Sequence, residues 1–404
     1  NLSIASGKTL TVGDGTHPAG IIFREQNTAK DQSHLFQGNG TLSFGNSHGV
    51  VWFGSPIQNG WGANRQLAWN TKTSGAAGMT FAGDTLAGSR TYPLLWLSNG
   101  KLDHSGDTYF YGLRVSPQTA GSFPVGKGDV HILGGLGGLG AQFFPSASGT
   151  FSQNFHFSGV GNSTTPQNEN LDGYGVVSLD EKAITFTGRV VLEDDSHFVA
   201  SATGGAVFSG AITGPGWLRL YGGSWEYRSA GNAYSGGTEV TGGATLTLRD
   251  EATPGCGPLT VPNGCVKFVN CTNTLAGTVS NAQKIEFQRA QVSLSADYAA
   301  DNTRVGQDVK LMPAGTMDLG SVSQVGSAEI ASASASATVS GTVAGQEYVH
   351  DFAVSVSLGE AVDQPTWTFD TSSDFPWTVA FDQKRTMVSA VSAGLGMNGI
   401  SLTS

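Results

Sequence analysis

One acidic run has the residue types and spacing for chemistry: Glu193, Asp194, Asp195 and, two positions later, His197. Paired carboxylates of this kind can bind calcium, or can serve as acid and base in the cleavage of a glycan. The run separates two apolar segments, RVVL at 189–192 and HFVA at 197–200, which is where a solvated turn belongs. We therefore interpret it as a turn. The pair Asp180 and Glu181, which follows another apolar segment, has the same interpretation.

The histidines supply no recognised catalytic or metal motif. The sequence has neither an HExxH pattern nor a GxSxG motif, and the histidines show no paired ligand spacing. They are His17, His34, His48, His104, His131, His156, His197 and His350. The glycine-rich run GGLGGLG at 134–140 lacks the Lys-Ser/Thr end of a phosphate-binding loop and is expected to be a turn. A catalytic triad dispersed along the chain has no support. We predict no catalytic, cofactor-binding or metal-binding residues, and a protein that is not an enzyme.

The three cysteines, Cys256, Cys265 and Cys271, lie within sixteen residues of one another. Their spacing fits no zinc-ligand template, and no histidine lies nearby to complete a site. Two alternatives stay open. The first is one disulfide with one leftover thiol, as an oxidising compartment would allow, and the second is three reduced thiols packed in the fold.

Tryptophans are the other candidates for a binding site, because aromatic rings stack on the faces of sugars. They form two groups in the sequence: Trp52, Trp61 and Trp69, and then Trp367 and Trp377. The intervals of eight or nine residues in the first group could bring its members together. Large aromatic residues more often close the ends of a core. Glycan contact at either group is therefore an alternative hypothesis.

The composition predicts a folded, nearly all-β protein. Glycine accounts for 58 of the 404 residues, and charged residues make up only 13%, against a usual value of about 25%. The hydrophobic content of 39% is enough to build a core, so the glycines indicate frequent turns. A net charge of -10 argues against nucleic acid as a partner. No run of 18 apolar residues is present, so we expect no membrane-spanning helix.

Short alternating segments recur along the chain, each followed by glycine. In the stretch 231–248, GNAYSGGTEVTGGATLTL, two runs with period-2 alternation are separated by paired glycines. The segment 105–115 aligns with 230–240 and places Tyr109 on Tyr234. Closely spaced short strands suit either a sandwich or a solenoid, and a module that recurs at long range favours the solenoid. Val240, Ala244, Leu246 and Leu248 would then point inward, with Tyr234 at one corner and the glycine pairs at others.

The segment 209–248 resembles the autotransporter-associated β-strand repeat of bacteria. The residues that carry the resemblance are Gly210, Ile212, Gly214, Gly216, Leu218, Leu220, Asn232, Tyr234, Gly236, Gly237, Thr238, Val240, Gly243 and Leu246. The similarity covers about residues 100–275 well, residues 1–60 faintly and the end of the chain hardly at all. It implies a right-handed parallel β-helix in a secreted or surface-exposed bacterial protein.

The last part of the chain has a different pattern. The segments 328–341 and 348–360 alternate cleanly over a greater length than the earlier ones, as antiparallel strands with one solvated face do. We predict a parallel β-helix over 1–320 and an antiparallel β cap or small sandwich over 321–404. A continuation of the helix with irregular turns is the alternative.

These patterns predict an extracellular structural or adhesive β-solenoid. At its start, residues 1–15 alternate as a strand with Leu2, Ile4, Leu10 and Val12. An uncovered strand there could pair with the C-terminal strands of another copy, giving head-to-tail filaments. Surface glycans are the other possible partner. A glycan-binding or glycan-degrading β-helix enzyme is the alternative function.

Overall fold

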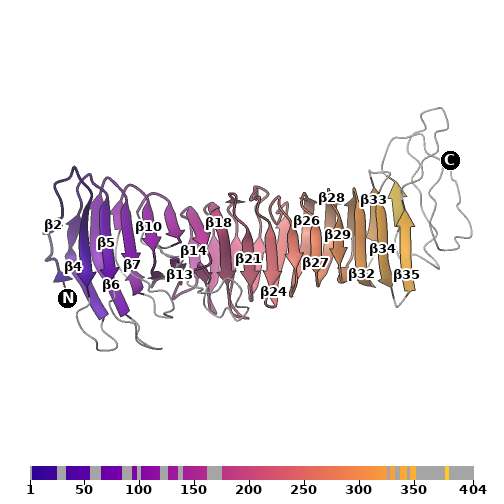
Figure 1. The fold of residues 1–404 in the computed structure, drawn as a ribbon, viewed down its shortest axis with the longest axis horizontal. Helices are drawn as coiled ribbons and strands as arrows, with labels where there is room; N and C mark the ends of the chain where they lie inside the picture. The colour runs from indigo at the N-terminus through magenta and orange to yellow at the C-terminus, as the bar shows by residue number, and fades with distance from the viewer. Residues whose placement is uncertain are drawn as a thin grey trace, which may run out of the picture. The chain divides into compact units, whose positions relative to one another are not determined.

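The computed structural model describes residues 2–24, 33–54, 65–83, 93–97, 102–118, 126–134, 140–161, 175–324, 328–332, 337–343, 346–351 and 378–381. Within these ranges every regular element is a β-strand and none is a helix. The strands form the predicted right-handed parallel β-helix (Figure 1). The chain divides into two compact units, 1–224 and 225–404, which are described separately.

In unit 1, each turn of the chain adds one strand to each of several parallel ladders. The first ladder contains, in order, β3 (Ala19–Arg24), β5 (Gly49–Gly54), β7 (Met79–Gly83), β10 (Thr108–Tyr111), β12 (Val130–Leu133), β15 (Phe155–Gly159), β18 (Val190–Val199) and β20 (Ile212–Thr213). The second contains β1 (Leu2–Ser3), β4 (Ser33–Ser43), β6 (Arg65–Gly75), β8 (Pro93–Leu97), β11 (Arg114–Pro117), β13 (Gln142–Phe143), β16 (Val177–Ser178), the second half of β18 and β21 (Leu218–Tyr221).

Shorter ladders complete unit 1. One joins β2 (Thr9–Thr11) to the ends of β4 and β6 and then to β9 (Leu102–His104). Another joins β14 (Gly149–Phe151), β17 (Ala183–Phe186) and β19 (Gly205–Phe208). The strand β22 (Ser224–Tyr227) begins at the last residue of unit 1.

The core of unit 1 is built from the inward side chains of these strands. Neighbouring strands place Phe81 opposite Phe110, and Phe110 opposite Ile132. All three are buried, and the two phenylalanine rings stack with their centroids 5.5 Å apart. Burial of one such side chain stabilises the fold by about 2 to 3 kcal/mol. Because side chains alternate between the two faces of a strand, the residues on either side of each inward position face outward.

Unit 2 is also a parallel solenoid. Its ladders contain β23 (Thr238–Thr241), β25 (Leu259–Val261), β27 (Val279–Ala282), β29 (Tyr298–Ala300), β32 (Thr316–Gln324) and β34 (Thr338–Val343) on one side, and β24 (Ala244–Asp250), β26 (Gly264–Leu275), β28 (Ile285–Leu294), β30 (Asn302–Val305), β31 (Val309–Pro313), β33 (Ala328–Ser332) and β36 (Thr378–Phe381) on another. Leu246, Val266, Ile285 and Thr303 occupy equivalent positions, so these successive turns are nearly equal in length.

The corner predictions for 231–248 are confirmed. Val240, Ala244, Leu246, Leu248 and Tyr234 are all fully buried. The backbone has positive φ at Gly237 (102°), Gly242 (62°) and Gly243 (79°), a region that L-residues rarely adopt. The proposed equivalence of Tyr109 and Tyr234 is wrong, however. Tyr109 is a half-buried residue on the outward face of β10, whereas Tyr234 is buried in the segment that precedes β23.

Another corner of unit 2 is made without glycine. Asp250, Asn270, Arg289 and Asp308 all have left-handed φ, between 49° and 59°. They recur once per turn at nearly equal intervals, and the registers of β24, β26 and β28 pair the residues that flank them. Asp and Asn tolerate this conformation better than other non-glycine residues. Arg289 is therefore the unfavourable member of this stack.

The predicted boundary at 320/321 lies inside β32. This strand pairs in parallel with β30 before it and with β34 after it. Antiparallel pairing is found between β34 and β35 (Gln346–Asp351). The described part of 321–404 thus contains both kinds of pairing, and residues 352–377 and 382–404 lie outside the described part of the chain.

Candidate functional site

The acidic run lies at an exposed corner within β18. Before it, Val190–Leu192 pairs with β15 and β20; after it, Ser196–Val199 pairs with β16 and β21. Glu193, Asp194 and Asp195 are exposed, as predicted, but they lie within the strand β18 and not in a turn, so the turn interpretation is wrong. Asp194 Oδ1 accepts a hydrogen bond from the Asp195 amide at 2.8 Å, and Asp195 Oδ1 accepts one from the Trp217 amide at 3.0 Å. His197 is buried against the Trp217 ring, so it does not join the carboxylates in one site.

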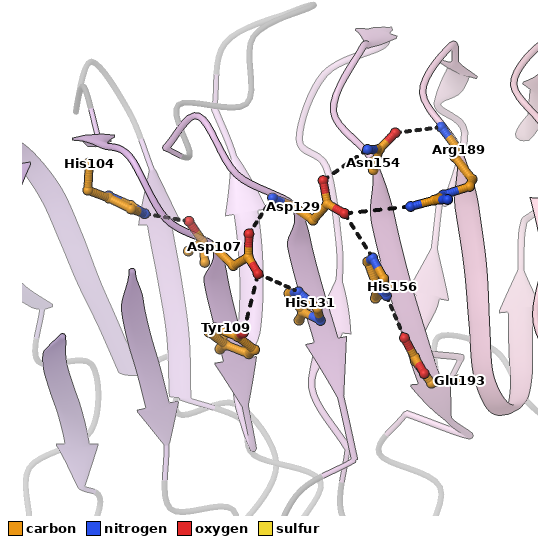
Figure 2. A network of polar contacts seen from close by, with 10 residues as sticks. His104, Asp107, Tyr109, Asp129, His131, Asn154, His156, Arg189 and Glu193 are labelled. Carbon is orange, nitrogen blue, oxygen red and sulfur yellow. Dashed lines mark hydrogen bonds and ion pairs between the residues drawn. The ribbon is translucent and has the colours of Figure 1, made fainter. Parts of the chain in front are cut away.

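A stack of three rings on the first ladder brings together residues that sequence analysis left apart. The strand register places Tyr109 opposite His131 and His131 opposite His156. The ring centroids are 4.4 Å apart for the first pair and 4.2 Å for the second, with interplanar angles of 16° and 24°. Figure 2 shows the three rings on successive strands. We call this set the ring stack.

A row of polar residues runs beside the ring stack, two residues before each ring and immediately before the first residue of each strand. Asp107 Oδ1 accepts a hydrogen bond from the Asp129 amide at 2.9 Å, and Asp129 Oδ1 accepts one from Asn154 Nδ2, also at 2.9 Å. Asn154 Oδ1 in turn accepts a hydrogen bond from the Arg189 amide at 3.0 Å (Figure 2). Each side chain in this polar row therefore bonds to the next turn of the solenoid.

The polar row and the ring stack are also linked to each other. Tyr109 donates a hydrogen bond to Asp107 Oδ2 at 3.3 Å, and His131 Nε2 lies 3.5 Å from the same oxygen. His156 contacts a carboxylate through each ring nitrogen: Nε2 lies 3.1 Å from Asp129 Oδ2, and Nδ1 pairs with Glu193 Oε1. Glu193 is thus the one member of the acidic run that reaches the ring stack.

The environment shifts the pKa values of three members of this network, His131, Tyr109 and Asp129. Burial lowers the pKa of His131, and electrostatic repulsion from the neighbouring His156 ring lowers it further. Burial and the nearby Asp107 carboxylate raise the pKa of Tyr109. Burial would raise the pKa of Asp129, but hydrogen bonds from Asn154 and His156 outweigh it and lower this pKa. At pH 7 the imidazole of His131 is therefore neutral, the phenol is protonated and Asp129 is ionised.

The contacts within the network occupy the ring faces and carboxylate oxygens that could otherwise bind a ligand or react with it. Each face of the His131 ring is covered by a neighbouring ring, and both Asp129 oxygens accept hydrogen bonds. Among the described residues, no group of three or more His, Cys, Asp or Glu side chains is arranged to hold a metal ion. The arrangement cross-links successive turns on the surface of the sheet.

A short sequence pattern marks the network, although sequence analysis did not use it. Asp or Asn stands two residues before Tyr or His in DTY (107–109), DVH (129–131) and NFH (154–156). Residues i and i+2 of a strand lie on the same face. The pattern is therefore the expected signature of a polar row beside a ring stack, once the three segments are known to be neighbours.

The tryptophans of the first group do not form one cluster. Trp69 is fully buried, with its ring centroid 4.5 Å from that of Phe36, whereas Trp52 points outward and is 38% exposed. Trp61, Trp367 and Trp377 lie outside the described residues, as does 135–139 of the glycine-rich run. Of the tryptophan candidates that the structure describes, Trp52 is the one available for contact with a ligand.

The cysteines are all free thiols, so the disulfide alternative is wrong. Cys271 is buried, Cys265 is half-buried and Cys256 is exposed. Burial raises the pKa of Cys265 to about 11 and that of Cys271 to about 12. These two thiols are therefore un-ionised at neutral pH and behave as small apolar side chains.

Comparison of the chain with protein-family models, with curated proteins and with solved structures finds no match. None of the described residues belongs to a helix of the length and hydropathy needed to cross a membrane.

Proposed function

We propose that this chain is an extracellular structural and adhesive β-solenoid that presents a rigid surface and does not catalyse a reaction. The main support for the proposal is the set of contacts that the ring stack and the polar row make. Their carboxylates and rings contact the next turn of the solenoid, so they stabilise the surface of the sheet instead of facing a substrate. The resemblance of 209–248 to the autotransporter-associated repeat supports a bacterial surface or secreted location.

Product analysis tests the non-catalytic part of the proposal. Incubation with pectin, alginate and glucan polymers should release neither reducing ends nor unsaturated products. If products appear, two double variants locate their source: D129N/E193Q in the network, and D194N/D195N at the exposed corner. Product formation that one of these variants abolishes would replace the proposal with the alternative, a glycan-degrading enzyme.

The proposal includes self-assembly through the first turn of unit 1. The strands β1 and β2 pair with β4, and β3 pairs with β5; their other edges have no partner among the described residues. Leu2 and Leu10 on this turn are 39% and 38% exposed. An open strand edge with exposed apolar side chains favours pairing with another copy, here with its C-terminal strands.

Light scattering and electron microscopy test the self-assembly. The full chain should form head-to-tail filaments whose length grows with protein concentration, and deletion of residues 1–15 should leave monomers. Monodisperse monomers from both proteins at high concentration would contradict it.

A further inference from the structure

A row of uncharged side chains crosses the outward face of the first ladder beside the ring stack. The register places one residue of the row on each of five successive strands, β3, β5, β7, β10 and β12. These residues, which we call the apolar stripe, are Ile22, Trp52, Ala82, Tyr111 and Leu133. Ile22 is 68% exposed and Trp52 38% exposed, and the other three are half-buried. Strands about 4.8 Å apart give the stripe a length of roughly 19 Å.

The two aromatic rings of the stripe differ from those of the ring stack. Trp52 and Tyr111 lie two strands apart, at roughly 10 Å, and the small side chain of Ala82 lies between them. Within the described part of the chain, neither ring packs against another ring, whereas both faces of the His131 ring are covered. Among the described residues, no other aromatic ring therefore covers a face of Trp52 or Tyr111, and their nearest neighbours along the stripe are Ile22, Ala82 and Leu133.

The width of the stripe argues against a protein as its ligand. A stable protein interface needs about 20 to 30 residues on each side. The stripe is one residue wide, and the row next to it runs from the smaller Gly20, Val50 and Thr80 to Tyr109 and His131 of the ring stack, so the two rows together hold only ten residues. A second copy of the chain would bury too few side chains here. A narrow, straight row suits a linear ligand instead.

Charge defines the chemistry of that ligand. No residue of the stripe is charged, and Asp107 and Asp129 of the polar row stand four residues before Tyr111 and Leu133, at roughly 13 Å for an extended chain. A polyanion or a polycation would find no opposite charge on the stripe. A neutral glycan has apolar ring faces, which pack on aromatic side chains. It also has hydroxyl groups along its edges, which can form hydrogen bonds with neighbouring polar side chains.

We propose that the apolar stripe binds a linear neutral polysaccharide, with Trp52 and Tyr111 as the two platforms on which sugar rings stack. The chain of sugars runs across the strands, along the direction in which the turns of the solenoid stack. This inference rests on the proposed adhesive function and names the ligand class and the surface.

Binding measurements with defined polysaccharides test the inference. The neutral probes are cello-oligosaccharides, laminarin and mannan, and the charged probes are alginate and heparin, each measured by calorimetry with the full chain. We expect binding of at least one neutral probe, unchanged between about 50 and 500 mM salt, because salt screens only interactions between charges. Trp52→Ala and Tyr111→Ala should each weaken binding about five- to tenfold.

Two further variants separate binding from folding. Tyr221→Ala removes a half-exposed tyrosine from the second ladder, where it pairs with Val199, and should leave binding unchanged. Ala82→Glu inserts a charge between the two platforms and should weaken binding even though both rings remain. Far-UV circular dichroism and thermal unfolding of each variant confirm that the fold is kept.

Three results would overturn the inference: binding of no neutral probe, salt-sensitive binding of a charged probe alone, or equal losses of affinity from Trp52→Ala and Tyr221→Ala.

Other outcomes separate the stripe from the remaining proposals. Self-association that Trp52→Ala abolishes would reassign the stripe to contact between copies. Product release in the incubation described above would overturn the proposed non-catalytic function whether or not the stripe binds. A chain that neither binds a glycan nor releases product would remove the stripe proposal alone.

Discussion

Three glycines of unit 2 allow backbone strain to be separated from crowding. Gly243 has a φ of 79°, and a Cβ built on it meets no atom within 4 Å. A Cβ on Gly257 would lie 2.4 Å from the Ser235 carbonyl oxygen, although its φ is ordinary. Gly237 combines both effects, with a φ of 102° and a Cβ 2.5 Å from the Pro258 carbonyl oxygen. Alanine at Gly243 therefore measures backbone strain alone, alanine at Gly257 measures crowding alone, and alanine at Gly237 measures both together.

The expected losses of unfolding free energy follow from these geometries. A left-handed φ costs an L-residue about 1 to 2 kcal/mol, and removal of a glycine from the unfolded chain returns about 0.4 to 1 kcal/mol. Gly243→Ala should therefore cost about 1 kcal/mol. Crowding against backbone that must shift costs about 1 to 3 kcal/mol, so Gly257→Ala should cost about 1 to 2 kcal/mol. Gly237→Ala should cost about 3 kcal/mol because both penalties apply.

Denaturant unfolding of the full chain, followed by far-UV circular dichroism, measures the order of the three losses. Gly7→Ala in unit 1 is a matched control, because Gly7 has a φ of 72° and open space around its Cβ position. It should behave like Gly243→Ala. A loss for Gly243→Ala as large as that for Gly237→Ala would refute the reasoning, because the Pro258 contact would then contribute nothing.

Two other predictions concern the left-handed corner and the buried histidines. Arg289→Asn should raise the free energy of unfolding by about 0.5 to 1 kcal/mol, because Asn tolerates the φ of 49° better than Arg; Arg289→Ala should bring no gain in the same denaturation assay. Burial lowers the pKa of both His104 and His197 to about 4, against 6.5 in the unfolded chain. Their neutral forms therefore stabilise the fold above pH 6.5, and this stability is lost as the pH falls from 6.5 to 4, by about 2 to 3 kcal/mol for each histidine. Unfolding curves at pH 7.5 and 4.5 measure the loss, and a His197→Phe variant that keeps the full pH dependence would contradict the assignment to His197.

The turns and inward faces could be predicted from sequence because local physics determines them. In 231–248 the alternation of side chains along a strand shows which residues are buried, and Gly237 and Gly243 stand where the backbone needs positive φ. No long-range information is required for either feature. The state of the cysteines stayed open for the opposite reason, since the pairing of Cys256, Cys265 and Cys271 depends on distances that only the fold sets.

The ring stack could not be predicted because it depends on register between distant segments. The interval from Tyr109 to His131 differs from the interval from His131 to His156, so no fixed period aligns the three rings. Turns of unequal length hide the repeat in unit 1. The tryptophans show the same limit, because Trp52 and Trp69 are close in sequence yet face opposite sides of their strands.

The spacing of rings along the ladder determines whether an aromatic residue stabilises the fold or remains available for a ligand. Rings on successive strands, such as Tyr109 and His131, are close enough to cover each other's faces, and their centroids are only 4.4 Å apart. Rings on alternate strands, such as Trp52 and Tyr111, are separated by roughly twice the strand spacing, and Ala82 between them is too small to cover either one. The same outward face therefore carries a stack of rings in contact and, two residues further along each strand, a pair of rings that contact no other described ring. Replacement of Ala82 by a large aromatic residue would close the pair, and the glycan surface proposed here requires that it stay open.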